Sequence, residues 1–334
     1  MKEEDISSEK AMKQIQKIFK KRGTKALEMA RKEILQEKIE CKEAREALTY
    51  FMTEYWHDTA RPALMSLVCE AVGGDTNVTT PIAVPMILIS GAIDIHDDII
   101  DQSKSKDGRP TVYGKFGKDV ALLVGDALLF EGLTLLNEGI AKGVPAEKMP
   151  LVVDIIRRMF FELGDAEAME LLFRRRIDVS PKNYLHIVKK KAADVEAHTR
   201  ISAILGGGTI DEIKALSEFG RLLGMLIILR DDWIDIIDLK ESRHRIQNEC
   251  LPLPMLYALQ NQTTKPKFNS IIQKGKVTQS DLQEILKLTK ETEGMKKFEK
   301  LARGLGSKAV FQIRNIKCNK ERLELLVRAV LPSV

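Results

Sequence analysis

Two acidic clusters of the same form, each directly after a long apolar stretch, constrain this chain more than any other feature. The stretches are residues 84–95 and 222–229, and each cluster carries aspartates at positions i, i+1 and i+4. The six aspartates are Asp97, Asp98, Asp101, Asp231, Asp232 and Asp235. Residues i and i+4 of a helix lie on one face, one turn apart. Two such faces turned toward each other would form an all-oxygen site for hard divalent cations. Two exposed acidic helix ends are the simpler interpretation, but such ends rarely follow apolar stretches.

The composition favours helices over strands. The chain has 334 residues with 44% hydrophobic and only 5% aromatic residues, and Leu, Ile, Ala, Lys and Glu are plentiful. These are good helix formers, whereas strand-like alternation and Asn-Gly hairpin signals are absent. Because no linker divides the chain, we predict one all-α domain over residues 1–334.

Helical periodicity and turn residues place the elements. The stretches predicted as helices include 9–19, 25–37, 42–56, a long helix from about Pro81 through the first cluster, 118–138, 146–173, 180–205 and 210–239. Residues 102–110 are predicted to form a loop. The charged stretch 240–249 is predicted to be a mobile loop.

The charge pattern argues against nucleic acid as a partner. A formal charge of +5 is small for this length. Six basic residues and no acidic one fall between Lys10 and Leu27, which a solvated helix face explains; peripheral contact with an anionic membrane is the alternative. The four cysteines show no ligand spacing, there is no signal peptide, and no uninterrupted apolar stretch reaches the roughly 20 residues of a membrane span. We therefore expect a soluble, cytoplasmic protein with free thiols.

The motifs around the clusters resemble those of the trans-isoprenyl diphosphate synthases, also called polyprenyl synthetases. The resemblance is strongest over residues 60–259. After the first cluster come Gly108-Arg-Pro-Thr111, Phe116-Gly117 and Leu123-Val-Gly-Asp-Ala-Leu128, in the order found in the family. Gly220 to Gly224 precedes the second cluster and Leu251-Pro252 follows it.

The resemblance implies a fold and a chemistry. It implies the isoprenoid synthase type I fold, a helical bundle around a central cavity, usually assembled as a homodimer. It also implies that Mg²⁺, as three ions, bridges the six aspartates and the diphosphate of an allylic prenyl substrate, so that the diphosphate can leave. An apolar pocket would then shield the carbocation from water.

The family also holds diphosphate oxygens with basic side chains. Lys191 matches the lysine of its Lys-Thr motif within one residue, although Ala192 replaces the threonine. Lys106 falls where the first of two arginines is expected. Arg61 is the one retained residue of a basic motif, and Arg243 or Arg245 is expected to supply charge from the loop after the second cluster.

Several positions depart from the pattern that binds isopentenyl diphosphate, the second substrate of the family. Asp58 stands where a lysine is expected, Ser90 where a histidine or glutamine is expected, and Asp107 where the second arginine is expected. Ile227-Ile228 replaces a Phe-Gln pair, and Asn248 replaces a lysine. A carboxylate in place of a cation repels a phosphate, so the isopentenyl site is expected to be degenerate.

Two small or aliphatic positions before the first cluster bear on substrate length. Ala92 and Ile93 stand where short-product members carry aromatic residues. A prenyl tail of geranylgeranyl length or longer is therefore expected to fit, although helix packing explains Ala92 equally well.

Three functions follow from these observations. The first is ionisation of an allylic prenyl diphosphate with transfer to an acceptor other than isopentenyl diphosphate, or with cyclisation of the substrate. The second is ordinary chain elongation with isopentenyl diphosphate by a rewired pocket. The third is a non-catalytic subunit that regulates a partner synthase; complete acidic clusters argue against it.

Overall fold

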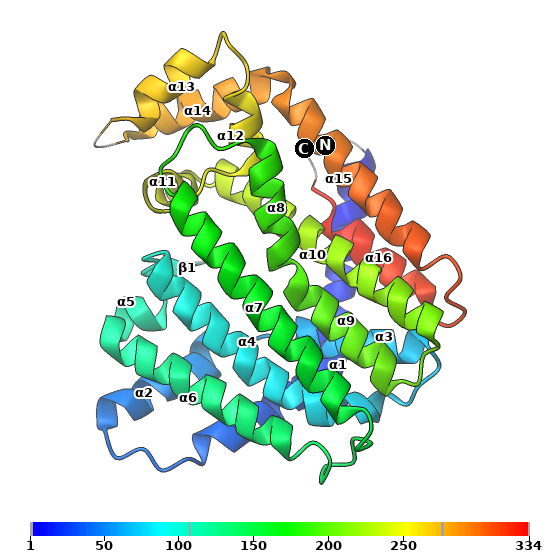
Figure 1. The fold of residues 1–334 in the computed structure, drawn as a ribbon. Coiled ribbons are helices and arrows are strands. Elements are labelled where there is room, and N and C mark those ends of the chain that lie inside the picture. Colours follow the sequence, from blue (N-terminus) through cyan, green and yellow to red (C-terminus); the bar gives the residue numbers. More distant parts are fainter. Residues whose placement is uncertain (1–2, 107, 275–276, 333–334) are drawn as a thin grey trace.

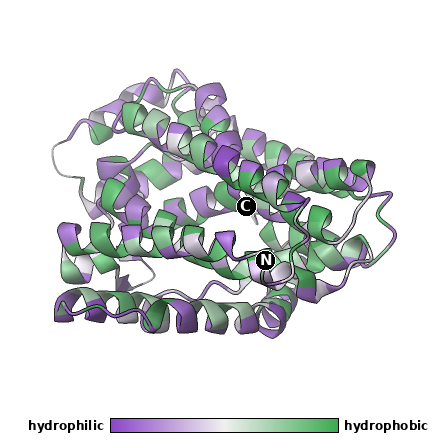
Figure 2. Cartoon of the chain, turned by 60° about the horizontal axis from the view of Figure 1, so that its bottom comes forward, coloured by the Kyte–Doolittle hydropathy of each residue, from purple (hydrophilic) through white to green (hydrophobic). Residues whose placement is uncertain are grey.

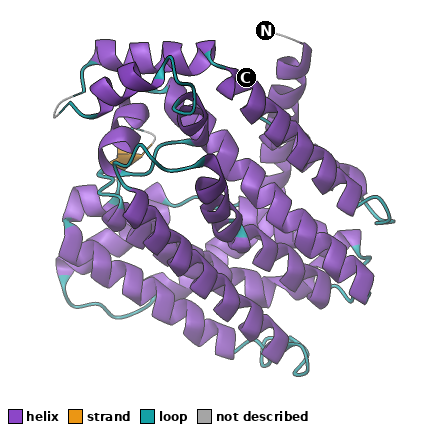
Figure 3. Cartoon of the chain, turned by 45° about the horizontal axis from the view of Figure 1, so that its top comes forward, coloured by secondary structure: helices purple, strands orange, loops and turns teal. Residues whose placement is uncertain are grey.

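The computed structural model describes residues 3–106, 108–274 and 277–332, and it confirms the all-α prediction (Figures 1 and 3). Asp107, expected to oppose phosphate, lies outside the described residues. The helices of the first half are α1 (Glu3–Leu35), α2 (Lys42–Tyr50), α3 (Ala60–Ala71), α4 (Thr80–Ile100), α5 (Val112–Phe116), α6 (Lys118–Asn137) and α7 (Met149–Phe173). Those of the second half are α8 (Pro181–Lys191), α9 (Ala193–Leu205), α10 (Ile210–Ile237), α11 (Leu239–Asn248), α12 (Leu253–Ala258), α13 (Lys265–Ile272), α14 (Gln279–Glu291), α15 (Glu293–Gln312) and α16 (Lys320–Val330).

The N-terminal region forms one helix, α1, and the prediction of two helices was wrong. Gly23 lies inside α1 without breaking it. A Cβ atom at this position would lie 2.1 Å from the carbonyl oxygen of Thr59, so glycine allows α1 to pack against the backbone that precedes α3. Gly23 therefore allows two backbone segments to approach each other closely, and it does not end a helix.

The stretch 240–249 forms α11, so the prediction of a mobile loop was also wrong. Asp238 ends α10 and caps α11, accepting hydrogen bonds from the backbone N–H groups of Lys240 and Glu241. Ser242 and Ile246 are buried. The capping carboxylate and these two buried residues explain why a segment so rich in charge is helical.

Two further boundaries differ from the predictions. The single helix expected over 180–205 is divided at Ala192 into α8 and α9. Within residues 102–110, a two-residue antiparallel pair forms between β1 (Ser105–Lys106) and β2 (Arg109–Pro110). Two helical turns of other types, η1 (Phe51–Tyr55, a π-helix) and η2 (Thr76–Thr79, a 3-10 helix), complete the described elements.

The hydrophobic residues pack into two clusters. One gathers residues mainly of α8 and α10 to α16, the other mainly of α2, α4, α6 and α7, and the helices α1, α3 and α9 contribute to both. Ile213 packs against both. Figure 2 shows that hydrophilic residues lie mainly on the outer faces of the helices. That the whole chain is one domain stays a prediction.

Helix α4 carries the first acidic cluster through the interior. With the preceding turn it covers Thr76–Ile100 and is long and apolar enough to cross a membrane, but 72% of its most apolar window is buried inside the protein. It packs against α1, α3 and α6, as expected of a core helix. Its apolar composition therefore reflects burial on all sides.

Candidate active site

The first acidic cluster lies at the C-terminal end of α4. Asp97 and Asp98 are in the last turn, and Asp101 is the residue that ends the helix. The side chain of Asp97 is 31% exposed and that of Asp101 is 14% exposed, whereas that of Asp98 is only 1% exposed. The helical repeat therefore turns the first and last aspartates toward the open site and the middle one toward the interior.

Lys106 of β1 lies among the carboxylates at this end of α4. Its Nζ atom is 2.7 Å from an oxygen of Asp98, 3.7 Å from Asp97 and 3.9 Å from Asp94. Neither oxygen of Asp98 receives a well-aligned hydrogen bond from the described residues. Lys106 thus provides positive charge for the cluster. Its contact with the diphosphate stays a prediction.

The second cluster lies near the C-terminal end of α10. Its first and last aspartates are likewise more exposed than its middle one. The side chains of Asp231 and Asp235 are 58% and 27% exposed, and that of Asp232 is 2% exposed. Asp232 accepts hydrogen bonds from the Tyr184 hydroxyl at 2.6 Å, from Arg245 at 2.7 Å and from the backbone N–H of Leu253 at 3.2 Å. This carboxylate therefore joins α10 to α8, α11 and α12.

Arg245, on α11, is the second of the two arginines expected to supply charge. Besides Asp232 it contacts Glu249 at 2.7 Å and Asp235 at 3.8 Å. Arg243, the other candidate, is exposed. The structure thus brings Arg245 into the site from a helix that the sequence did not predict.

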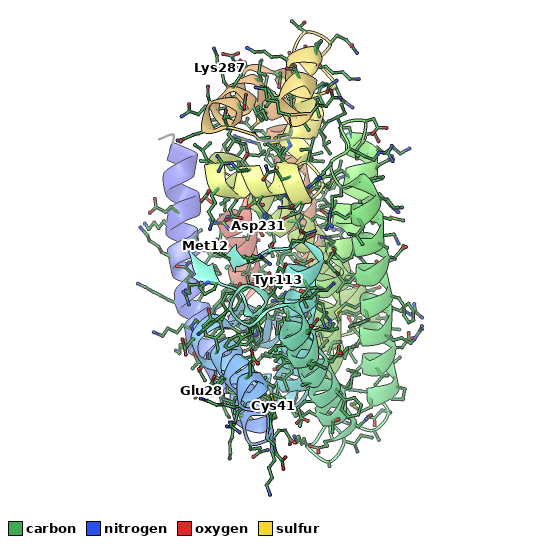
Figure 4. All side chains as sticks on the ribbon, turned by 90° about the vertical axis from the view of Figure 1, so that its left-hand side faces the viewer. Met12, Glu28, Cys41, Tyr113, Asp231 and Lys287 are labelled. Carbon is green, nitrogen blue, oxygen red and sulfur yellow. The ribbon has the colours of Figure 1, made fainter. Side chains whose placement is uncertain are left out.

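Two contacts join the segments that follow the clusters. Ser103, after the first cluster, lies 3.1 Å from a ring nitrogen of His244 on α11. Lys240, also on α11, donates to the hydroxyl of Ser105 on β1 at 2.9 Å. The ends of α4 and α10, which carry the two clusters, are therefore followed by segments that contact each other. Figure 4 labels Asp231 near the middle of the molecule.

Lys191 lies at the end of α8, where the Lys-Thr resemblance predicted a basic residue. Its ammonium group contacts Glu170 and lies 2.8 Å from Glu167, both on α7. Burial raises the pKa of Glu167 to about 7, although Lys191 opposes the shift. These two glutamates were not predicted from the sequence, because they belong to no motif and lie far from the clusters along the chain.

Arg174 is another site residue that the sequence analysis missed. It donates to the carbonyl oxygen of Ile100 at 2.8 Å and to Asp101 at 3.2 Å. The only signal was its position in the run Arg174-Arg175-Arg176, which any solvated turn would also explain.

Arg61 is paired with two carboxylates. It lies 3.0 Å from Asp58 and 2.9 Å from Asp194. Asp58, which stands where the family pattern has a lysine, is therefore paired with a cation in the structure. Its side chain is only 6% exposed.

A cavity of about 410 Å³ begins beside the first cluster. Its walls come from α1, α3, α4, α7, α8 to α10 and α16, and include Ile93, Ser90 and Lys191. Ala92 is fully buried and packs in the hydrophobic cluster of α4 and α6. The structure therefore places Ile93 at the cavity, whereas Ala92 is not among its lining residues.

Burial perturbs several carboxyl groups of the site. It raises the pKa of Asp98 to about 7, which Lys106 opposes and Asp94 reinforces. It raises the pKa of Asp101 to about 8, reinforced by Asp97 and Glu249. It also raises the pKa of Asp232 to about 7, which Arg245 opposes. Negative charge is thus only partly balanced, so the site would favour an added cation.

The residues fit a hard divalent cation in their chemistry. Carboxylate oxygens are the preferred ligands of Mg²⁺, which is commonly held by one or two carboxylates together with substrate phosphates. Within the described ranges, no group of three His, Cys, Asp or Glu side chains is arranged to hold a metal ion by itself. Such ions would therefore need the diphosphate as well as Asp97, Asp101, Asp231 and Asp235.

Comparison with known proteins found similar sequences. The polyprenyl synthetase family profile matches residues 42–289. A short-chain isoprenyl diphosphate synthase of Methanothermobacter thermautotrophicus is 33% identical over 183 residues, which are 54% of this chain and 55% of that protein. A geranylgeranyl diphosphate synthase of Methanosarcina mazei is 31% identical over 57% of this chain and 58% of its own length. The chain thus spans a little over half the length of these relatives.

Solved structures extend the likeness to nearly the whole chain. The geranylgeranyl pyrophosphate synthetase of Pyrococcus horikoshii is 25% identical and superimposes with a TM-score of 0.83, covering 96% of this chain and 99% of that one. A decaprenyl diphosphate synthase of Rhodobacter capsulatus is 20% identical, with a TM-score of 0.79, and covers 97% of this chain and 98% of that one. The second likeness concerns the fold alone.

Proposed function

Because the chain belongs to the polyprenyl synthetase family, we propose that it is a magnesium-dependent prenyltransferase that ionises an allylic prenyl diphosphate. One observation carries the proposal. The first and last aspartates of both clusters, Asp97 and Asp101 with Asp231 and Asp235, are more exposed than the middle ones, and the segments that follow the two clusters contact each other.

The residues divide the work of the reaction. Bound Mg²⁺ would supply the charge that stabilises the departing diphosphate. Lys106, beside the first cluster, would bind diphosphate oxygens, and so would Lys191 once it leaves Glu167. Arg174 contacts Asp101, and Arg245 contacts Asp232. Ile93 and the aliphatic walls of the cavity exclude water from the allylic cation, which water would otherwise quench.

The first candidate acceptor is isopentenyl diphosphate, which would make the protein a chain-elongating prenyl diphosphate synthase. The relatives support this candidate, since those compared above are named short-chain isoprenyl or geranylgeranyl diphosphate synthases. They favour elongation over transfer to another acceptor, over cyclisation and over a non-catalytic subunit.

The second candidate is transfer to an acceptor other than isopentenyl diphosphate, or cyclisation. One structural observation favours it. Arg61, the residue retained from the expected basic motif, is occupied by Asp58 and Asp194 and would have to leave both to bind a phosphate.

One assay tests the proposal and separates the candidates. The protein is incubated with Mg²⁺ and farnesyl or geranylgeranyl diphosphate, with and without isopentenyl diphosphate, and released pyrophosphate and prenyl products are measured. Lengthened diphosphates support elongation; release without lengthening supports the second candidate. No release under any of these conditions contradicts the proposal. Asp97→Asn should remove release, whereas Asp211→Asn, exposed at the start of α10, should retain it.

Three other features are part of the proposal. We expect a homodimer, supported by exposed apolar side chains on α6 and α7 that include Phe130 and Phe161. We expect the protein to act in the cytoplasm. Peripheral membrane contact through the basic side of α1 stays a prediction; Lys17, Lys20 and Lys21 are exposed there.

A further inference from the structure

Three basic side chains from separate segments meet at the C-terminal end of η1, outside the cavity described above. They are Arg31 of α1, His57 just after η1 and Arg109 of β2. A guanidinium nitrogen of Arg31 lies 2.9 Å from Nδ1 of His57. Arg109 donates to the carbonyl oxygen of Glu54, within η1, at 3.0 Å. We call Arg31, His57 and Arg109 the basic cluster; none of the three is a lining residue of the cavity beside the first acidic cluster.

Backbone carbonyl groups hold both arginines of the basic cluster in place. Arg31 donates to the carbonyl oxygens of Met52 and Trp56, and Arg109 donates to that of Glu54. The last carbonyls of a helical segment lack partners within it, and cations are favourable beside them. This explains why each guanidinium is ordered, but it uses only part of each group. Nη1 of Arg31 and the Nε and Nη2 atoms of Arg109 make no hydrogen bond to the described residues.

The contact between Arg31 and His57 determines which ring nitrogen of His57 carries the proton. A guanidinium group can only donate, so Nδ1 of His57 accepts and the proton of the neutral ring lies on Nε2. Partial burial lowers the pKa of His57, and the charges of Arg31 and Arg109 lower it further. The ring is therefore neutral at pH 7, and its Nε2–H group is a third donor of the basic cluster, with no acceptor among the described residues.

The basic cluster has no carboxylate to balance it. In the part of the chain that the structure describes, the partners of Arg31 and Arg109 are carbonyl oxygens and His57, and no acid forms an ion pair with either arginine. Asp58, the residue after His57, instead pairs with Arg61 at 3.0 Å. Two guanidinium groups close to one imidazole repel each other's charge, and an anion would relieve this repulsion. Guanidinium donors match the oxygens of phosphate in geometry.

Neighbouring contacts fix β2 and add positive charge on this side of the molecule. The Tyr50 hydroxyl donates to the carbonyl oxygen of Pro110, the residue after Arg109, at 2.6 Å. The ammonium group of Lys115 lies 3.7 Å from the centre of the Tyr50 ring. Glu54 opposes these cations with a carboxylate whose charge also reaches Tyr50. The donors of the basic cluster are thus held by the fold before any ligand arrives.

From these contacts we infer that the basic cluster is an anion site that binds a phosphate group through Arg31, Arg109 and the Nε2–H group of His57. The phosphate group has two possible sources, a free phosphate ion and the terminal phosphate of a diphosphate. The site is separate from the aspartate clusters, and binding there requires neither Mg²⁺ nor a prenyl substrate. The inference therefore goes beyond the proposed function and stands or fails separately from it.

The experiment follows the imidazole signals by NMR in protein labelled at its five histidines, without Mg²⁺ and at constant pH. The signal that is lost in His57→Asn identifies His57. Inorganic phosphate is added while chloride keeps the ionic strength constant, so that screening does not change. The His57 signal should shift and saturate, with half-saturation on the order of 1 mM phosphate. A His57 signal that does not move, or that moves without saturating, would overturn the inference.

Substitution of one arginine tests the donors. Arg109→Gln should raise the phosphate concentration at half-saturation at least tenfold, because it removes a charge from the basic cluster while its amide can still donate to the Glu54 carbonyl. Arg157→Gln is the matched control, since Arg157 is an exposed arginine on α7 that pairs with Asp154 at 2.6 Å; it should bind phosphate as the wild type does. Should Arg109→Gln fail to fold, Arg109→Lys keeps the charge and should weaken binding by a smaller factor. Unchanged affinity in a folded Arg109 variant contradicts the inference.

Two further titrations test the location and the source of the phosphate group. Lys106→Ala removes a cation from beside the first acidic cluster and should leave the phosphate response of His57 unchanged; loss of the response would place the anion there and overturn the inference. Pyrophosphate is then titrated in place of phosphate. Half-saturation of the His57 signal at a concentration at least tenfold lower supports the terminal phosphate of a diphosphate as the ligand. Equal or weaker binding of pyrophosphate supports free phosphate.

Discussion

At the scale of single residues, the aspartates of each cluster fall into two kinds. The exposed ones, such as Asp97 and Asp231, can reach cations and substrate, whereas Asp98 and Asp232 are buried. The sequence predicted all six as metal ligands, because spacing alone shows which carboxylates share a face but not which face meets the core. The geometry favours the four more exposed aspartates for direct contact, and the metal role of all six stays a prediction.

The two kinds should respond differently to removal of their charge. Asp232→Asn leaves the buried guanidinium of Arg245 short of a counter-ion, so the free energy of unfolding should fall by about 2–4 kcal/mol. Asp231→Asn should leave stability within about 0.5 kcal/mol and lower the rate of pyrophosphate release by roughly 100-fold or more. Urea unfolding and the release assay measure the two effects. Equal loss of stability in both variants would contradict the division.

The raised pKa values of Asp98 and Asp101 predict how stability depends on pH without Mg²⁺. Their folded-state pKa values, about 7 and about 8, exceed the unfolded value of about 4. The folded chain therefore holds protons that the unfolded chain has lost, and stability should fall as the pH rises from 6 to 8.5. Melting temperatures in EDTA across this range measure the effect.

The matched control for this pH dependence is the double variant Asp98→Asn with Asp101→Asn. It lacks both titrating groups, so its melting temperature should decline less over the same range. Mg²⁺ should also reduce the decline in the wild-type protein, because cation binding favours the ionised carboxylates. A wild-type melting temperature that rises over this range in EDTA would contradict the assigned directions.

At the scale of secondary-structure elements, glycine and capping residues explain the boundaries that the sequence analysis misplaced. Gly23→Ala should destabilise the protein by about 1–3 kcal/mol, since its Cβ would overlap the Thr59 carbonyl. Gly304→Ala, in α15 with no atom within 4 Å of the added Cβ, should stabilise it by about 0.5–1 kcal/mol. Thermal unfolding compares the two. Stabilisation by both would show that Gly23 is not needed for close packing.

The Asp238 cap should be needed to keep α11 ordered. Asp238→Ala removes the acceptor for two backbone N–H groups and should cost about 1 kcal/mol. Amide hydrogen exchange should rise in Leu239–Asn248, while α14, capped independently by Thr278, should exchange at an unchanged rate. Unchanged exchange in α11 would mean that burial of Ile246 and the ion pairs of Arg245 suffice to hold it.

These elements show what could be predicted from the sequence. Periodicity located α4 and α10, because both are long and each ends in its own cluster. Two further residues of the site could not be found in this way. Arg174 meets Asp101, and Glu167 meets Lys191, only through the packing of distant segments. Local charge also misled the prediction for α11, which is capped by Asp238 and joined to α10 by the contact of Arg245 with Asp232.

At the scale of the whole molecule, α6 and α7 carry large apolar side chains that the described part of the chain leaves exposed. Phe130 is 74% exposed, Phe161 71% and Leu172 70%. Exposed large apolar side chains concentrated on neighbouring helices mark interaction surfaces. Together with the resemblance of the fold, they support the proposed homodimer.

Negative charges introduced on the exposed apolar side of α6 and α7 should prevent two protomers from associating. Phe130→Glu with Phe161→Glu should convert the dimer to a monomer, measured by light scattering on a sizing column. Phe311→Glu, a substitution of another exposed phenylalanine (58%) on α15, should leave the dimer intact. A wild-type protein that is monomeric at micromolar concentration would refute the proposed assembly.

The most direct test of the central claim is calorimetric titration of the protein with a non-hydrolysable geranylgeranyl diphosphate analogue, with and without Mg²⁺. We predict tight binding only with Mg²⁺, loss of that binding in Asp97→Asn and in Asp231→Asn, and unchanged binding in Asp211→Asn. Binding of equal affinity without Mg²⁺, or binding unaffected by either cluster variant, would contradict the claim that the two clusters jointly hold the metal and the diphosphate.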